Sequence, residues 1–309
     1  MIWGNEKVSV LIPIKNEEGN VSRLVTTLLA VLENSNYEII FIDDGSTDNT
    51  LHHLKSLHTQ NEKIHYLSFS RNFGHQSALR AGYHYASGDC VICMDGDLQH
   101  PPQLIPQMVE KWREGYDIVN TIRKDGATTG FIKKLTSSFF YTLMNRLSDI
   151  KIEKGSADFR LVDKHIVEVI RNFQESPIFF RGIISWLGFK QYAIEYIPDE
   201  RTWGKTKYSF TRMLKFAVSG ITSFSIKPLR LSAFTGLVVA LFAFLYGLYA
   251  IYMKIFQNNT IPGWTSTLIV ISFIGGIQLI MIGILGEYIG KLFIESKRRP
   301  DYIIREKSL

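Results

Sequence analysis

Two long uncharged runs near the carboxyl end constrain this chain more than any other feature of its sequence. The first extends from Leu231 to Met253, and the second extends from Thr265 to Gly286, before Glu287. As a helix, either run is long enough to cross the hydrocarbon core of a bilayer, which is about 30 Å thick. Two such runs in tandem are rare in soluble cores. The sequence therefore predicts a transmembrane hairpin rather than a buried helical pair.

Charges that flank the two runs predict the orientation of the hairpin. Lys215, Lys227 and Arg230 precede the first run, a basic cluster at 291–299 follows the second, and the connection contains only Lys254. Cytoplasmic flanks of membrane helices carry the excess of Lys and Arg. We therefore expect both chain ends in the cytoplasm and the short loop outside.

The composition indicates a folded protein with more than one part. Hydrophobic residues make up 46% and charged residues 21% of the chain, which excludes a disordered protein. A length of 309 residues exceeds a usual single core. The net charge of +6 is concentrated beside the apolar runs, which favours a membrane partner and no nucleic acid. Two cysteines cannot form a disulfide scaffold.

The first 121 residues alternate short apolar runs with helical patterns. The strand candidates are 8–13, 37–43, 64–68, 90–94 and 117–121, and the helical patterns are 19–33, 48–57, 76–86 and 102–114. This alternation predicts a doubly wound α/β domain with a mostly parallel sheet. Functional residues in such sheets gather at the carboxyl ends of the strands.

Polar side chains follow four consecutive predicted strands. Glu17 follows the first, Asp44 the second, Arg71 the third, and Asp95-Gly96-Asp97 the fourth. A single Asp-Asp-Gly-Ser segment is a common turn and helix cap. Four strands that end in this way indicate a functional edge.

The Asp95-x-Asp97 pair has a specific chemical use. Carboxylate oxygens at this spacing can bind Mg²⁺ or Mn²⁺, while water and a diphosphate complete the coordination shell. A cation there neutralises a departing diphosphate. The sequence contains no P-loop and no G-x-G-x-x-G, which argues against an NTPase and a dinucleotide-binding enzyme.

The whole chain resembles the family 2 glycosyltransferases of the polyprenyl-phosphate branch. The resemblance is carried, in order, by VSVLIPIKNEEGN, IIFIDDGSTDNT, LSFSRNFGHQSAL, MDGDLQHPP, ADFRLVDKHIV and RTWGKTKYS. The tail GGIQLIMIGILGEYIGKLFIESKRRPDYII is similar to that of bactoprenol glucosyltransferases of O-antigen (lipopolysaccharide) modification clusters. Dolichol-phosphate mannose synthases are more distant relatives. The resemblance implies a GT-A catalytic domain, with a Rossmann-like sheet, before the hairpin.

The resemblance and the hairpin together predict six segments. They are a cytoplasmic GT-A domain at 1–208, an interfacial amphipathic segment at 209–230, transmembrane helices at 231–253 and 265–290, an external loop at 254–264, and a cytoplasmic basic tail at 291–309. Residues 209–225 suit either a helix along the inner membrane surface or an amphipathic helix of the soluble domain.

The resemblance also implies roles for matching residues. The nucleotide-sugar site would contain Pro13, Glu17, Asp44, Asp95 and Gln99; the metal ligands would be Asp95 and Asp97; the acceptor phosphate would meet Arg123, Arg201 and Lys207; and the catalytic residues would be Asp158, Asp97 and Arg201. Two positions depart from the family pattern. Gly96 stands where Ala or Val is commoner, and Ala157 stands where Gly is usual.

The implied reaction transfers a hexose, glucose from UDP-glucose being favoured, to undecaprenyl phosphate at the bacterial inner (cytoplasmic) membrane. Because a lipid monophosphate has a second pKa of about 6, it is largely a dianion at neutral pH and needs no strong general base. Inversion would give a β-linked lipid phosphosugar. UDP-N-acetylglucosamine, UDP-galactose and GDP-mannose remain alternative donors, and a non-catalytic flippase partner is the alternative from another class. The sequence leaves homo-oligomer formation open.

Overall fold

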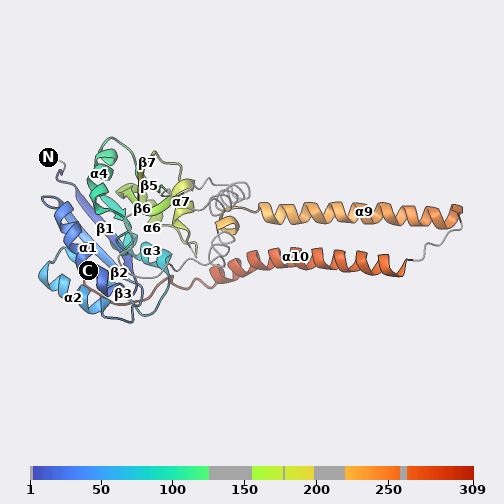
Figure 1. Ribbon diagram of the computed structural model, residues 1–309, viewed down its shortest axis with the longest axis horizontal. Helices are drawn as coiled ribbons and strands as arrows, with labels where there is room; N and C mark the ends of the chain where they lie inside the picture. Colours follow the sequence, from blue (N-terminus) through green and yellow to red (C-terminus); the bar gives the residue numbers. More distant parts are fainter. Residues whose placement is uncertain (1–2, 125–154, 177, 198–219, 258–262) are drawn as a thin grey trace. The chain divides into compact units, whose positions relative to one another are not determined.

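The computed structural model describes residues 3–124, 155–176, 178–197, 220–257 and 263–309. The chain divides into two units, one made of Met1–Thr142, Ile150–Phe210 and Arg299–Leu309, and the other of Leu143–Asp149 and Thr211–Arg298. The first unit contains a β-sheet with helices, and the second contains two long helices (Figure 1). Residues 209–219 of the predicted interfacial segment and 258–262 of the predicted loop lie outside the described residues, whereas 227–230 and 254–257 belong to the helix Lys227–Gln257.

The first unit is built on one sheet, which has the strand order β7-β5-β6-β4-β1-β2-β3-β8 among the described residues. The strands are β1 (Lys7–Ile14), β2 (Asn36–Asp43), β3 (Ile64–Phe69), β4 (Cys90–Cys93), β5 (Ile118–Arg123), β6 (Ser156–Asp163), β7 (Gln191–Tyr196) and β8 (Ile304–Lys307). Neighbours from β4 through β1 and β2 to β3 are parallel, whereas β6 is antiparallel to β4 and β5. The predicted mostly parallel α/β sheet is therefore confirmed.

Helices follow the strands as the alternating pattern predicted. They are α1 (Glu18–Val31), α2 (Thr50–Gln60), α3 (His75–Tyr85), a 3₁₀ turn at Pro102–Leu104 that leads into α4 (Ile105–Arg113), α6 (Lys164–Arg171) and α7 (Phe180–Trp186). Both faces of β1 are buried, as expected of a central parallel strand. Val10 and Ile12 belong to the core that includes α1 and α4, whereas Leu11 faces α3, where a Cβ on Gly82 would lie 2.9 Å from Leu11 Cδ1.

The last residues of the chain add an antiparallel edge strand that the sequence pattern did not indicate. β8 pairs with β3, and the Ser70 amide donates to the Ile303 carbonyl at 2.9 Å. The Tyr302 ring stacks on Phe69 with centroids 5.1 Å apart. Residues 301–308 are therefore part of the α/β domain rather than a free tail, and the sheet edge of β3 is covered.

An ion pair anchors this segment to the domain. The Arg80 guanidinium of α3 donates to the Asp301 carboxylate and to the Phe173 carbonyl, and also to the Glu175 carbonyl at 3.0 Å. The side chains of Arg80 and Asp301 are 20% and 12% exposed, so solvent screens the pair only partly.

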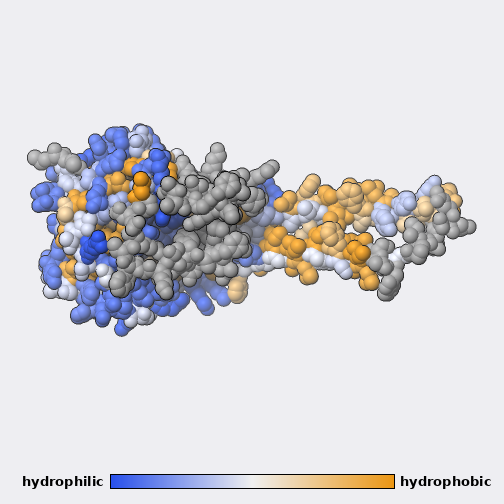
Figure 2. Space-filling view, viewed as in Figure 1, coloured by the Kyte–Doolittle hydropathy of each residue, from blue (hydrophilic) through white to orange (hydrophobic). Residues whose placement is uncertain are grey.

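The second unit contains α9 (Lys227–Gln257) and α10 (Trp264–Ser296), which lie side by side as a hairpin (Figure 1). Both are long and apolar enough to cross a membrane, with mean hydropathies of 2.1 and 2.6 over the candidate spans. Their most apolar windows are 0% buried, and apolar side chains cover their surface (Figure 2). A helix that is apolar all round but exposed requires a hydrocarbon environment.

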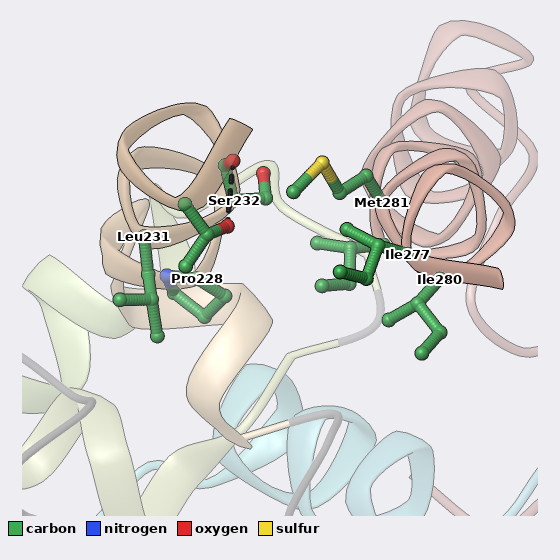
Figure 3. Close-up of a pocket in the computed structure, with 8 residues that line it drawn as sticks. Pro228, Leu231, Ser232, Ile277, Ile280 and Met281 are labelled. Atoms are coloured by element: carbon green, nitrogen blue, oxygen red, sulfur yellow. Dashed lines mark hydrogen bonds between the residues drawn. The ribbon is translucent and has the colours of Figure 1, made fainter. Parts of the chain in front are cut away.

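A cavity of about 420 Å³ lies between the two helices of the hairpin. It is lined by Pro228, Leu231, Ser232, Thr235, Ile277, Ile280, Met281 and Ile284 (Figure 3). The Ser232 hydroxyl donates to the Leu229 carbonyl at 2.8 Å, and the Thr235 hydroxyl donates to the Ser232 carbonyl at 2.9 Å. Because both hydroxyls are satisfied within α9, the cavity presents a hydrocarbon wall.

We expect Asp301→Asn to destabilise the α/β domain, because it leaves the Arg80 charge without its carboxylate partner. Loss of a hydrogen bond between charged groups costs about 2 kcal/mol, which corresponds to a fall of roughly 4–8 °C in melting temperature for a domain of this size. Glu306→Gln is the matched control, because its partner Lys55 is 44% exposed and such pairs contribute about 1 kcal/mol or less. Thermal unfolding in detergent compares the two, and equal shifts would contradict the anchoring role.

Candidate active site

The strand register brings two predicted carboxylates to the same edge of the sheet. β4 and β6 are antiparallel, and Cys93 pairs with Arg160. The strand pairing ends there, and beyond it the carboxylates of Asp95 and Asp158 both lie near His75 Nε2, at 3.7 and 3.4 Å. The carboxyl end of β4 and the amino end of β6 therefore lie together. The turn at 95–99, which contains the predicted metal ligands Asp95 and Asp97 and is called the metal turn below, lies beside Asp158, the predicted catalytic aspartate.

Asp158 is buried and surrounded by cationic groups. Arg181 Nε and Nη2 donate to its two carboxylate oxygens, each at 2.9 Å, and Arg160 Nη2 donates to Oδ1 at 3.0 Å. His75 Nε2 lies 3.4 Å from Oδ2. Burial alone would raise the pKa of Asp158, but Arg181, His75 and Arg160 outweigh burial and hold this pKa well below its usual range. Asp158 is therefore an ionised anchor at neutral pH.

His75 connects Asp158 with the metal turn. It is the first residue of α3, and its Nε2 also lies 3.7 Å from Asp95 Oδ1. One imidazole thus stands between carboxylates of two strands, which reduces their mutual repulsion when the ring is protonated.

The turn after β4 presents two carboxylates in a constrained backbone. The Asp95 side chain is 38% exposed, and Asp97 Oδ1 accepts the Gln99 amide at 3.2 Å. Leu98 adopts a left-handed conformation with φ of 63°, which is unusual for a bulky residue.

No group of three or more His, Cys, Asp or Glu side chains within the described residues is arranged to bind a metal. The pair fits a cation such as Mg²⁺, which is commonly held by one or two carboxylates and substrate phosphates.

Hydrogen bonds join the loops that follow β1 and β2, beside this turn. Asn16, at φ of 55°, accepts the Thr47 amide at 2.8 Å, and Glu17 accepts the Asn20 side-chain amide at 2.6 Å. The Glu17 amide donates to Thr50 Oγ1 at 3.0 Å. Predicted Pro13 lies inside β1, opposite Ile42 of β2.

Asp44 fixes the loop that follows β3. Its carboxylate accepts the Phe73 amide at 2.6 Å and the Gly74 amide at 3.0 Å. Burial raises the pKa of Asp44, although these two amides oppose the increase. Gly45 has a φ of 64°, and a Cβ there would lie 2.5 Å from the Arg71 carbonyl carbon. The close approach of the two loops therefore requires glycine at 45.

Arg123 and Tyr196 extend the edge on the other side of Asp158. They are paired neighbours at the carboxyl ends of parallel strands β5 and β7. Burial raises the pKa of Tyr196 to about 12, Asp95 and Asp97 add to the increase, and Arg123 opposes it. The charges of Asp95 and Asp97 therefore act on the Tyr196 hydroxyl. Predicted Arg201 and Lys207 lie outside the described residues.

Several residues of this edge were not among the sequence candidates. They are His75, His100, Arg160, Arg181 and Tyr196. Arg160 shares a strand face with Asp158 two residues away, so period-two alternation could have indicated it. The other four come from the starts of two helices, a turn and a strand end, without a spacing that marks them.

Two family descriptions match this chain. Residues 9–171 match "Glycosyl transferase family 2", and residues 227–292 match "GtrB C-terminal hairpin". A prophage bactoprenol glucosyl transferase homolog of Escherichia coli (strain K12) is 44% identical, with 97% of this chain and 98% of the relative covered. The bactoprenol glucosyl transferase of Shigella phage SfV is 43% identical, with 97% and 99% covered.

Among solved structures, mannosyl-3-phosphoglycerate synthase from Rubrobacter xylanophilus shares the fold with a TM-score of 0.51 at 17% identity, over 71% of this chain and 73% of that chain. Fold and sequence together define a glycosyltransferase with a GT-A catalytic domain and a C-terminal apolar hairpin. The chain belongs to glycosyl transferase family 2.

We expect Gly96→Ala to impair sugar transfer, although the resemblance implies that Ala or Val is commoner at this position. A Cβ at Gly96 would overlap the Ile14 Cγ2 methyl, and overpacking of this kind costs about 1–3 kcal/mol. The double variant Gly96→Ala/Ile14→Ala removes the clash and should recover transfer, with Ile14→Ala as the control. Transfer rates in membranes measure the effect, and an unimpaired Gly96→Ala variant would refute this packing constraint.

Proposed function

We propose that this chain transfers glucose from UDP-glucose to undecaprenyl phosphate and forms a β-linked lipid phosphosugar for cell-envelope glycosylation. The observation that carries the proposal is its similarity to proteins named bactoprenol glucosyl transferase, which extends over 97% of the chain and includes the hairpin. The carboxylate edge and the apolar hairpin supply what such a reaction requires: a site for a nucleotide diphosphate and an anchor at the membrane.

In this proposal, the nucleotide-sugar donor binds against the loops that follow β1, β2 and β4. Glu17, Asp44 and Gln99 follow the ends of these strands, and Pro13 is the second-last residue of β1. Asp95 and Asp97 would hold Mg²⁺ or Mn²⁺, which supplies charge neutralisation for the departing diphosphate. The 38% exposure of the Asp95 side chain keeps the turn accessible.

The acceptor phosphate would bind near Arg123, Arg201 and Lys207, as the resemblance implies. Arg123 is exposed at the same edge as Asp158. Because the phosphate dianion is already a nucleophile, the site needs cationic groups that overcome its repulsion from the donor diphosphate. Attack from the face opposite the leaving group inverts the anomeric centre.

Asp158 has a positioning role in this mechanism. Its paired contacts with Arg181 fix a guanidinium beside the edge, and its low pKa makes it a poor proton acceptor. A phosphate nucleophile needs no proton removed, so an ionised anchor is consistent with the reaction.

The hairpin would place the enzyme in the bacterial inner membrane. The proposed spans 231–253 and 265–290 fall within α9 and α10. Basic residues at the start of α9 and after α10 favour a cytoplasmic position for both chain ends. Nucleotide sugars are made in the cytoplasm, so this orientation gives the catalytic domain access to its donor.

A panel of radiolabelled nucleotide sugars tests the function. Membranes that contain the protein and undecaprenyl phosphate receive labelled UDP-glucose, UDP-N-acetylglucosamine, UDP-galactose or GDP-mannose, and the extracted lipid is counted. We expect label from UDP-glucose, abolished by EDTA and by Asp97→Asn, whereas Glu110→Gln on the exposed face of α4 retains activity.

Three outcomes would contradict the proposal in different ways. Lipid labelling from another nucleotide sugar would show that glucose is not the sugar transferred. Full activity in excess EDTA would show that the reaction needs no cation. Absence of lipid labelling from every donor would show that undecaprenyl phosphate is not the acceptor.

A further inference from the structure

The turn that contains Asp95 and Asp97 has a constrained backbone, which Asp97 stabilises in part by accepting the Gln99 amide at 3.2 Å. Leu98 holds a left-handed backbone conformation with φ of 63° between Asp97 and Gln99. Such a conformation is unfavourable in a bulky residue and persists only when the surroundings impose it. The neighbours of the turn should therefore include a group that fixes its backbone.

His100 holds the backbone at the start of this turn. Its side chain is 7% exposed, and its Nδ1 accepts the backbone amide of Asp95 at 3.0 Å. A backbone N–H can only donate, so Nδ1 carries the lone pair and the ring proton resides on Nε2. Nε2 lies 3.7 Å from Asp95 Oδ2, which is beyond hydrogen-bond length but close enough for a favourable electrostatic contact. One imidazole thus contacts both the backbone and the carboxylate of Asp95.

The ring of His100 is itself fixed by aromatic neighbours. It stacks on Phe159 with centroids 5.2 Å apart and an interplanar angle of 15°, and it meets Tyr196 edge-on at 6.0 Å. Phe159 follows Asp158 in β6. His100 therefore connects the turn after β4 to the strand that carries Asp158.

We propose that His100 is a positioning residue that orients Asp95 for cation binding, an inference that rests on the proposed function. His100 acts through Asp95 and does not touch the substrate. Partners that orient a metal-binding carboxylate typically contribute 10- to 100-fold in metal affinity. The contact with the Asp95 amide, rather than aromatic packing, carries this effect.

Two substitutions separate the hydrogen bond from the packing. His100→Phe keeps an aromatic ring on Phe159 but removes the acceptor for the Asp95 amide. His100→Asn places a carbonyl oxygen where Nδ1 stands but removes the stacked ring. His84→Phe, at an exposed position of α3, is the control for replacing a histidine with phenylalanine.

The measurement is Mn²⁺ affinity of the full-length protein in detergent with UDP present, followed by the electron paramagnetic resonance signal of free Mn²⁺. We expect His100→Phe to weaken Mn²⁺ binding about 10- to 100-fold, and His100→Asn and His84→Phe to remain within a few-fold of the wild type. Melting temperatures identify any variant that does not fold, and His100→Asn then still tests the acceptor.

The reverse pattern, with tight binding by His100→Phe and weak binding by His100→Asn, would overturn the proposal in favour of packing alone. Equal affinities in all variants would also overturn it, while the proposed function would stand. Absence of Mn²⁺ binding in the wild type would reject the cation site and this proposal with it, whereas the lipid-labelling experiment tests the proposed function separately.

Discussion

The buried ion cluster around Asp158 is the interaction on which the organisation of this active edge depends. The antiparallel pairing of β6 with β4 brings Asp158 near Asp95, because both carboxylates lie close to His75 Nε2, and two carboxylates at neighbouring strand ends repel each other. A buried carboxylate needs paired cations. Arg160 supplies one from the same strand, and Arg181 and His75 supply others from α7 and α3. The cluster thus holds two helices against the edge of the sheet.

The charge state of Asp158 follows from this cluster. Its pKa in the folded protein is lowered, so its contribution to stability is fully present above the unfolded pKa of about 3.9 and is lost as pH falls through the lower folded value. Across the physiological range the carboxylate is therefore ionised and fixed. Asp158 is therefore not poised as a general base, which is consistent with an acceptor that is already a phosphate dianion.

The sequence predicted β1–β5, the helices between them and the two apolar helices, because each is marked by local periodicity or by length. It did not indicate β8, whose four residues are too short for a periodic signal, or the pairing of β6 with β4 across about 70 residues. Asp95, Asp97 and Asp158 were predicted as site residues from motifs. Arg181 and His100 were not, because their roles arise only when tertiary contacts bring them to these aspartates.

Asp158 is an anchor for Arg181 that stays ionised at neutral pH, rather than a proton acceptor. A carbon-13 NMR titration of the Asp158 carboxyl group, assigned by comparison with Asp158→Asn, tests this claim most directly. We predict that the carboxyl resonance stays at its ionised position from pH 8 down to about pH 4, near the usual aspartate value. Uptake of a proton by this carboxyl group between about pH 6 and 7, where a general base titrates, would contradict it.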